Sequence, residues 1–521
     1  MTVLSALLLA AALPADKQLV YDSIFEPLAV AAQPGDSARD LTMLPDGEIR
    51  HYGRKLIGDT VHRVYISSRD NGLNWELRLA SKDDAPICPP IPWKDLEPRP
   101  PIALRHPAGR ILMSCSNVSK TNDCYHASCV WSDDGGRTWR RSDVPRTPGV
   151  ERRSKWDLRP HWFNDGCEPS VAELNDGTLL MALRTSGPHL AFSRSRDGGE
   201  SWSVPEPDPR FWQANTMPCL LKLKDGRLLL FWNNTEMLPT RDVAEYPELG
   251  GDERRGKWET AFTNRDAIHA AISEDDGKTW IGFREVLLNA CRNEVDFREL
   301  GNAPDMNWDK SVHQPQALEL PGGKVMLAVG QNVPRRILIF DPKWLYEQGR
   351  ETDFRHGIGD LSSFLYVRSL SGGWRGWAGH CAWNRLPGPV MVKDPFDPKS
   401  VREVLQICRL DDPRLVSPRQ GIVWNFPAMR KGSVEIECRI EGEGLRASVL
   451  DHWVNPCDER SDEVAVKTVR ATRDSLGSGW RTIRLSWNLP EGQQVSYLHL
   501  QTLADRPDTR GAFVRSLKAR K

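Results

Sequence analysis

Residues 132–139 read SDDGGRTW, and the pattern Ser-x-Asp-x-Gly-x-x-Trp that they follow occurs four times in the chain. The other copies are SRDNGLNW (68–75), SRDGGESW (195–202) and SEDDGKTW (273–280). Asp and Gly favour a tight turn between antiparallel strands, the Asp carboxylate accepts hydrogen bonds from N–H groups of the turn, and the Trp packs beside it. We therefore predict structural and not catalytic roles for Asp70, Asp134, Asp197 and Asp275.

A second repeat interleaves with the first, a polar turn with Gly that leads into an apolar strand. Its copies are LPDGEIRHYGR (44–54), HPAGRILMSCS (106–116), LNDGTLLMALR (174–184), LKDGRLLLFWN (223–233) and LPGGKVMLAVG (320–330). Two alternating turn motifs in each repeat are typical of four-stranded sheets arranged around a central axis. The two repeats predict an all-β fold, with a six-bladed β-propeller over residues 16–398 whose last blade lies near 355–395.

The turn motifs stop at about residue 400, and alternating strands such as SVEIECRIEG (433–442), WRTIRLSW (480–487) and VSYLHLQTL (495–503) follow. This pattern predicts a C-terminal β-sandwich over residues 399–521. The sandwich either binds carbohydrate or braces the propeller, and we favour bracing.

Composition limits the classes of partner. The chain has 70 Lys and Arg and 70 Asp and Glu, so no net field attracts nucleic acid or an anionic membrane, and an anion site must be local. No apolar run reaches the roughly 20 residues of a membrane span. The 11 Cys lack metal-ligand spacing, and no phosphate-binding loop or dinucleotide motif is present, so we expect no metal and no cofactor. Cys124 and Cys129 are near enough to pair, but nothing requires a disulfide.

The N-terminal residues 3–13, VLSALLLAAAL, form a short apolar run followed by Pro14-Ala15-Asp16. This is similar to the apolar region and cleavage site of a signal peptide, so residues 1–15 predict a secreted or periplasmic protein. No Lys or Arg precedes the run, and a buried first strand or helix is the alternative.

Asp boxes of this kind on a predicted propeller resemble the sialidase superfamily. The resemblance covers roughly residues 36–330 and implies an exo-acting glycoside hydrolase, an exo-α-sialidase, that releases a terminal acidic sugar such as sialic acid. In that family three arginines from three blades bind the sugar carboxylate, and an Arg guanidinium suits a carboxylate because it can donate two parallel hydrogen bonds. The matching positions here are Arg39, Arg184 and Arg265. The Ile-Pro that the family has beside its first arginine is absent at Arg39.

The most specific match is Glu168 to Leu174 followed by Met181 to Arg184, which resembles the family's glutamate and second arginine in order and spacing. Arg265 stands eight residues before Ser273 of the fourth Asp box, as the family's third arginine does. Arg54 and Asp59 have the spacing of a further substrate-binding arginine and of the acid that protonates the leaving oxygen. A turn Asp beside Gly58 is the structural alternative for Asp59.

His313 stands where the family has its nucleophilic tyrosine, in the segment Lys310-Ser311-Val312-His313-Gln314-Pro315. Either His313 and Glu168 activate a water for direct displacement, which we favour, or His313 attacks covalently. Tyr346 and Tyr366 are the alternatives for a displaced nucleophile. We expect Arg39, Arg184 and Arg265 to converge, and His313 to face the same pocket as Glu168.

Two other functions fit the same residues. A lyase for uronate polysaccharides would use the arginines to neutralise a carboxylate and a His to remove a proton. A carbohydrate-binding propeller without turnover would keep the arginines alone, although it would need neither Asp59 nor Glu168. The substrate or ligand is an acidic glycan in all three cases.

Overall fold

The computed structural model describes residues 19–25, 41–81, 84, 88–118, 124–149, 163–236, 265–288, 312–330, 335–355, 357–359, 361–367, 384–415, 417–459 and 461–521. The described part is nearly all β-structure. Its helices are a 3-10 turn at Pro342–Tyr346 and one short α-helix, α3, at Arg473–Leu476. No helix in these ranges has the length and apolar character needed to cross a membrane. The predicted signal peptide lies outside the described residues.

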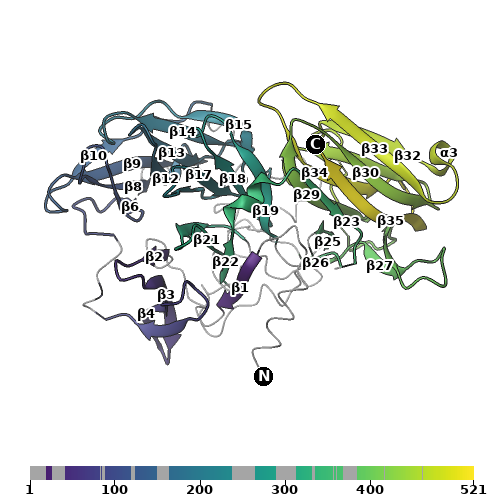
Figure 1. The fold of residues 1–521 in the computed structure, drawn as a ribbon, viewed down its shortest axis with the longest axis horizontal. Coiled ribbons are helices and arrows are strands. Elements are labelled where there is room, and N and C mark those ends of the chain that lie inside the picture. The colour runs from purple at the N-terminus through teal and green to yellow at the C-terminus, as the bar shows by residue number, and fades with distance from the viewer. Residues whose placement is uncertain are drawn as a thin grey trace.

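Five sheets of mainly antiparallel strands follow one another along the N-terminal two thirds of the chain (Figure 1). The first sheet holds β2 (Leu41–Met43), β3 (Ile49–Ile57), β4 (Thr60–Ser68) and β5 (Glu76–Leu79). The second holds β6 (Leu96–Pro98), β7 (Ile102–Ala103), β8 (Ile111–Val118), β9 (Cys124–Ser132) and β10 (Arg140–Asp143), with β11 (Phe163–Asn164) beside β9. The third holds β12 (Cys167–Glu173), β13 (Leu179–Arg184), β14 (His189–Ser195) and β15 (Glu206–Trp212).

The fourth sheet holds β16 (Cys219–Lys222), β17 (Leu228–Trp232), β18 (Ala267–Ser273) and β19 (Ile281–Leu288). The fifth holds β20 (Gln316–Glu319), β21 (Val325–Val329) and β22 (Arg335–Phe340), and β1 (Leu19–Phe25) completes it by pairing with β22. First strands of successive sheets touch: β12 contacts β16, β16 contacts β20, and β20 contacts β2. Because β1 pairs with β22, the fifth sheet combines a strand from the start of the chain with strands near residue 330.

The Asp boxes form the turns that the repeat predicts. In the second box the Asp134 carboxylate accepts hydrogen bonds from the backbone N–H groups of Arg137 at 3.0 Å and Thr138 at 2.9 Å. Trp139 folds back and donates its indole N–H to the carbonyl of Gly136 at 3.1 Å. Gly136 has φ +88°, a conformation that favours glycine. These contacts lower the pKa of Asp134, chiefly through Thr138, and they support the structural reading of the motif.

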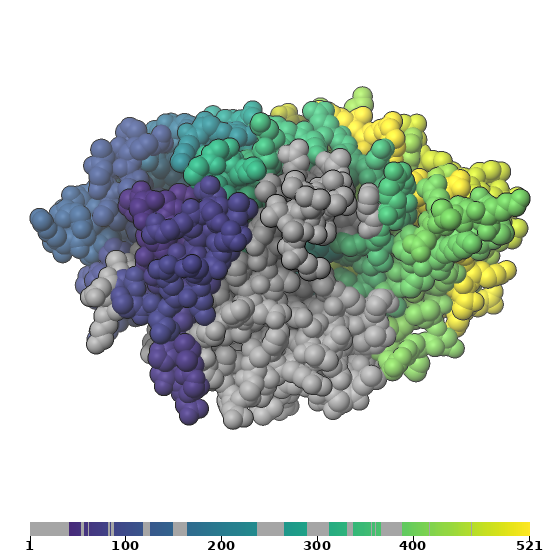
Figure 2. All heavy atoms as spheres, turned by 60° about the horizontal axis from the view of Figure 1, so that its bottom comes forward, coloured from purple at the N-terminus to yellow at the C-terminus, as the bar shows by residue number. Residues whose placement is uncertain are grey.

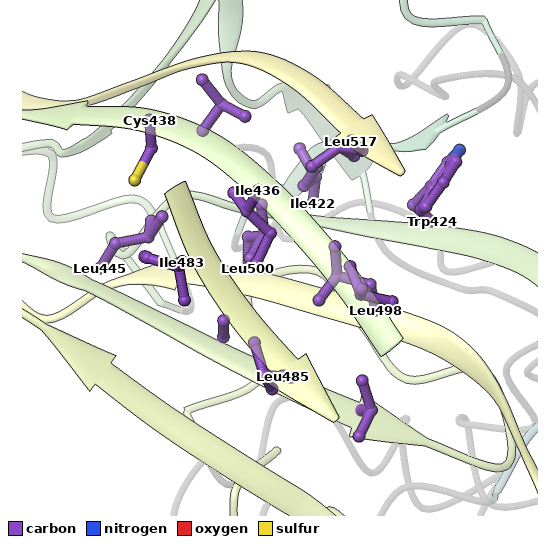
Figure 3. Close-up of a cluster of buried hydrophobic side chains, with 14 of the residues drawn as sticks. Ile422, Trp424, Ile436, Cys438, Leu445, Ile483, Leu485, Leu498, Leu500 and Leu517 are labelled. Atoms are coloured by element: carbon purple, nitrogen blue, oxygen red, sulfur yellow. The ribbon is translucent and has the colours of Figure 1, made fainter. Parts of the chain in front are cut away.

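The C-terminal strands form two sheets. One holds β23 (Gly349–Thr352), β27 (Val390–Lys393), β28 (Glu403–Arg409), β30 (Lys431–Ile440), β33 (Arg481–Asn488) and β35 (Asp508–Arg520). The other holds β24 (Leu361–Ser362), β29 (Gly421–Met429), β31 (Leu445–Leu450), β32 (Lys467–Ala471) and β34 (Val495–Thr502). Their facing side chains share one apolar core, in which Ile422, Leu498 and Leu500 of one sheet meet Ile436 and Leu485 of the other (Figure 3).

Of the strands described between residues 349 and 393, where a sixth blade is predicted, three pair with strands of the C-terminal sheets. β23, β24 and β27 pair with β35, β29 and β28 of the C-terminal sheets, and β25 (Phe364–Val367) pairs only with β26 (Asn384–Pro387) among the described strands. Edge strands leave backbone N–H and C=O groups without partners, and these short strands satisfy them. The C-terminal sheets thus include strands from Gly349 onward, and the sixth blade stays a prediction, for which β25 and β26 remain.

A buried polar contact joins the N-terminal sheets to the C-terminal sheets. In Figure 2 the first sheet, in purple, lies on the left, and the C-terminal sheets, in green and yellow, lie on the right. The Tyr497 hydroxyl of β34 donates to Glu285 of β19 at 2.7 Å and accepts from His269 of β18 at 2.5 Å. Asn425 of β29 accepts a hydrogen bond from the Glu285 N–H at 2.9 Å and donates to the Phe283 carbonyl at 3.1 Å.

Candidate functional site

The candidate residues gather at one end of the sheets, which we call the site end. Cys167 and Arg184 pair there, because β12 begins and β13 ends at that edge. Arg265 comes just before β18, and His313 comes just before β20. In an antiparallel sheet the start of one strand lies beside the end of the next. The Asp boxes and Gly turns lie at the opposite end, the turn end, since Leu179 pairs there with Ser195.

Glu168 and Arg184 form a close ion pair. The Arg184 Nη1 lies 2.5 Å from the Glu168 Oε2, and the Arg99 Nη2 lies 3.4 Å from the other carboxylate oxygen. The Glu168 N–H donates to the Ser116 hydroxyl at 2.8 Å. Glu168 has φ +43°, a left-handed conformation that costs a non-glycine residue roughly 1–3 kcal/mol and is found most often at functional sites.

The charge state of Glu168 is set by its arginines. Burial opposes ionisation, but the guanidinium groups of Arg184 and Arg99 outweigh it and lower the pKa of Glu168 to about 2, with a smaller contribution from Arg265. Glu168 is therefore an anion throughout the physiological range and accepts hydrogen bonds only. In this state it cannot donate a proton to a leaving group.

Arg265 joins the same cluster from the fourth sheet. Only 1% of Arg265 is exposed, its Nη2 donates to the Asn215 carbonyl at 3.0 Å, and its Nη1 lies 2.5 Å from the His313 Nε2. The Asn215 side-chain oxygen accepts from the Arg184 Nε at 2.8 Å. The structure thus brings together four of the predicted residues, Glu168, Arg184, Arg265 and His313.

His313 is bound to Arg265 through its Nε2. A guanidinium has donors and no acceptor, so Nε2 must be the acceptor and the proton of the neutral ring must lie on Nδ1. The residue is 1% exposed. In this arrangement the ring orients Arg265, and the Nε2 lone pair is already engaged and cannot also take a proton from water.

The remaining predicted residues are placed only in part. Arg39 lies outside the described residues, and so does the side chain of Arg54. Asp59 lies exposed in the turn between β3 and β4, whose end residues Ile57 and Thr60 pair. Within the described ranges no hydrogen bond or ion pair joins Asp59 to the cluster of Glu168.

Tyr346 is excluded as a displaced nucleophile by its position. Its hydroxyl donates to Glu274 at 2.6 Å and accepts from Arg227 at 3.3 Å, and both of these residues lie at the turn end. The side chain of Tyr366 lies outside the described residues, as does that of Cys124. Cys129 is a free, buried thiol.

Sequence reasoning missed three residues of the site, Arg99, Asn215 and Tyr125. Tyr125 is the second residue of β9 and lies at the site end, and Ala127 on the same face of the strand packs against Gly166, where a Cβ would lie 3.6 Å from the Ala127 Cβ. The pKa of Tyr125 is raised to about 12, chiefly by burial, with contributions from Cys167, Glu97 and Glu168, and Arg184 opposes the shift. No motif surrounds these residues in the sequence, so only the fold could have revealed them.

A cavity of about 430 Å³ runs along the first strands of the sheets. Arg99, Pro169 and Pro315 line it at the site end, and Glu173 and Lys222 line it at the turn end. Arg99 both lines the cavity and lies 3.4 Å from Glu168, so the cavity reaches the edge of the cluster and has room for water or for part of a ligand.

Comparison with known proteins identifies a protein family that matches the chain. The profile of a family described as BNR repeat-like domain matches residues 43–328, and no curated protein matches the chain. A solved protein of unknown function from Dyadobacter fermentans is 20% identical over 57% of this chain and 74% of its own, with a TM-score of 0.32.

Two sialidases of known structure are also similar. The NanB sialidase from Streptococcus pneumoniae is 16% identical, with a TM-score of 0.29, over 55% of this chain and 37% of its own. The Trypanosoma rangeli sialidase, solved with sialic acid, is 9% identical, with a TM-score of 0.29, over 96% of this chain and 95% of its own.

Proposed function

Because the chain belongs to the BNR repeat-like domain family, we propose that it is an exo-acting glycoside hydrolase that releases a terminal acidic sugar, sialic acid or a related one, from a glycan. We propose that the five described sheets are blades of a β-propeller, for which six blades are predicted, and that the C-terminal sheets form a β-sandwich that braces it. We also propose that the protein acts as a secreted or periplasmic enzyme.

The observation that carries this proposal is the convergence of two buried arginines from different sheets. Arg184 and Arg265 are 7% and 1% exposed, and both bind Asn215. Arginines are seldom buried without an anion, and Glu168 is the anion that pairs with Arg184 and Arg99. A guanidinium suits the carboxylate of an acidic sugar because it can bind that group with two hydrogen bonds.

The other roles follow from the same assignment. Arg39 and Arg54 add to the carboxylate site, and Asp59, at the tip of the β3–β4 hairpin, protonates the leaving oxygen. His313 with Glu168 positions water, as the sequence suggests, but His313 can take a proton from that water only after its Nε2 releases Arg265. Tyr125 is therefore the second candidate nucleophile, and its strand face and electrostatic coupling to Glu168 support it.

One assay separates the candidate functions. A panel of aryl sialosides and aryl uronides is incubated with the full chain, and the products are followed by absorbance and chromatography. Release of free acidic sugar supports the hydrolase, an absorbance increase from an unsaturated uronate would identify a lyase, and binding without either product would identify a carbohydrate-binding protein.

Two variants then separate the nucleophiles. Tyr125→Phe should lower kcat at least roughly 10²-fold if Tyr125 attacks, because the hydroxyl is the reacting group. His313→Ala should lower kcat by a similar factor if His313 activates water, and should mainly raise KM if it only orients Arg265. Tyr346→Phe, at the turn end, is the matched control and should leave both constants unchanged.

A further inference from the structure

Asn215 touches both buried arginines of the site. It lies in the connection between β15 and β16 and is fully buried. Its side-chain oxygen accepts hydrogen bonds from the Arg184 Nε and from the Asn164 Nδ2, each at 2.8 Å. Its backbone carbonyl accepts from the Arg265 Nη2 at 3.0 Å. One residue thus connects cations that belong to two different sheets.

The backbone of Asn215 explains how one residue can make both contacts. Its φ is +51°, in the left-handed region that Asn and Gly tolerate better than other residues. The connection is also anchored beside it, because Gln213 donates to the carbonyls of Thr185 and Gly187, each at 2.6 Å. Residues 213–216 therefore form a rigid bridge over the end of β13, which carries Arg184.

The chemistry of the contact matters as much as its geometry. Two guanidinium groups held near each other repel, and a carboxylate between them would neutralise one of them. The amide and the backbone carbonyl accept hydrogen bonds without adding a negative charge. Glu168 pairs with Arg184, and Asn215 holds both guanidinium groups without adding a second negative charge.

We propose that Asn215 is the positioning residue that presents Arg184 and Arg265 as one clamp for the substrate carboxylate. This inference rests on the proposed function, because it assigns the clamp to the carboxylate of an acidic sugar. It makes Asn215 a determinant of selectivity for anionic over neutral sugars, acting through the arginines and not by contact with the reacting atoms.

Asn215→Gly tests the side-chain contact alone. Glycine keeps the left-handed backbone and the carbonyl that binds Arg265, but it loses the oxygen that binds Arg184. We expect KM for an aryl sialoside or aryl uronide to rise about 10- to 100-fold, as for loss of a hydrogen bond to a charged group, with a small change in kcat. Asn71→Gly is the matched control, because Asn71 has φ +60° in the first Asp box and lies at the turn end.

Asn215→Asp tests the need for a neutral group. The introduced carboxylate can still accept from Arg184, but its charge competes with the substrate. KM should rise at neutral pH and fall again as the solution is acidified and the introduced carboxyl group is protonated. A purely structural role would not produce this pH dependence.

A neutral probe completes the experiment. Binding of sialic acid, of glucuronate and of their methyl esters is measured by calorimetry for the unmodified chain and for the variants. The proposal expects Asn215→Gly to weaken binding of the acids and to leave the esters unchanged. It is overturned if the acids bind Asn215→Gly as tightly as the unmodified chain, or if acids and esters weaken equally. If the unmodified chain neither binds nor hydrolyses any acidic sugar, the proposed function itself fails, and the clamp fails with it.

Discussion

Arg184 contacts two of the residues that hold the site together, Glu168 and Asn215. It pairs with Glu168 at 2.5 Å and donates to Asn215 at 2.8 Å. Arg184→Ala should lower kcat/KM by about 2–4 kcal/mol of transition-state binding, because a charge-assisted contact to the substrate carboxylate is lost. The change in kcat/KM is measured by steady-state kinetics on an aryl sialoside or aryl uronide.

The control for this variant is Arg105→Ala, since Arg105 binds Glu173 and the Leu174 carbonyl at the turn end. It should leave kcat/KM unchanged. Circular dichroism must show that both variants keep the fold. An Arg184→Ala variant of full activity and native fold would refute the role of Arg184 in carboxylate binding.

Glu168 should make the stability depend on pH. Its pKa in the folded chain is lowered to about 2 from an ordinary value of 4.5. A lowered pKa stabilises the fold above pH 4.5, and this contribution is lost as the pH falls through 4.5 toward 2, by up to about 3 kcal/mol. Urea unfolding of the unmodified chain at pH 6 and pH 3, compared with Glu168→Gln, should show a smaller loss in the variant. Equal losses of unfolding free energy in the two proteins would mean that Glu168 is not held as an anion. Glu491→Gln, on an exposed turn, is the control variant.

At the scale of elements, the Asp box is a hydrogen-bonded turn at one end of a sheet. In the fourth box the Asp275 carboxylate accepts from the Thr279 N–H at 2.8 Å, from the Thr279 hydroxyl at 2.6 Å and from the Ser273 hydroxyl at 2.9 Å. The N–H and hydroxyl groups must find other partners when the carboxylate is removed. The box therefore contributes to stability and stands apart from the chemistry at the site end.

Asp275→Ala should lower the free energy of unfolding by about 1–2 kcal/mol, because several hydrogen bonds to a charged acceptor are lost. The values of kcat and KM should not change, because the box lies at the turn end. Urea unfolding and steady-state kinetics measure the two effects. Asp411→Ala, at an exposed position before β29, is the control for both measurements. A loss of activity confined to Asp275→Ala would contradict the structural role predicted for the box.

At the scale of the whole molecule, the five N-terminal sheets and the C-terminal sheets meet through hydrogen bonds that are fully buried. Burial is the largest cause that lowers the pKa of His269 to about 3 and raises that of Tyr497 well above its ordinary value. The ring is therefore neutral and the hydroxyl protonated at neutral pH. Each donor and acceptor in this junction depends on its partner, because water does not reach it.

Tyr497→Phe should lower the free energy of unfolding by about 1–3 kcal/mol, because His269 and Glu285 each lose a buried partner. The two groups of sheets should also unfold less cooperatively. Thermal unfolding followed by calorimetry would show a lower Tm and a broader or divided transition. Tyr346→Phe is the matched control, since Tyr346 is only partly buried and lies at the turn end. An unchanged transition for Tyr497→Phe would show that the junction does not couple the two parts.

Much of the N-terminal fold is predictable because its signals are local. An Asp, a Gly and a Trp within eight residues specify a turn whatever the rest of the chain does, and the four Asp boxes mark successive sheets. The same holds for Glu168, Arg184 and Arg265, whose distance from a turn motif places them at the site end. The blade expected near 355–395 has no such signal, and it stays a prediction.

The sequence by itself determined the turns, the strands beside them and the end of each sheet at which a residue lies, because these depend on neighbours along the chain. Only the tertiary structure decided the partners of β23, β24 and β27, the bond between Arg265 and His313, and the presence of Asn215 and Tyr125 in the site. The physical reason is that edge strands, buried cations and polar groups take whichever partner the packing brings near. That partner is distant along the chain, so the sequence pattern around either residue does not identify it.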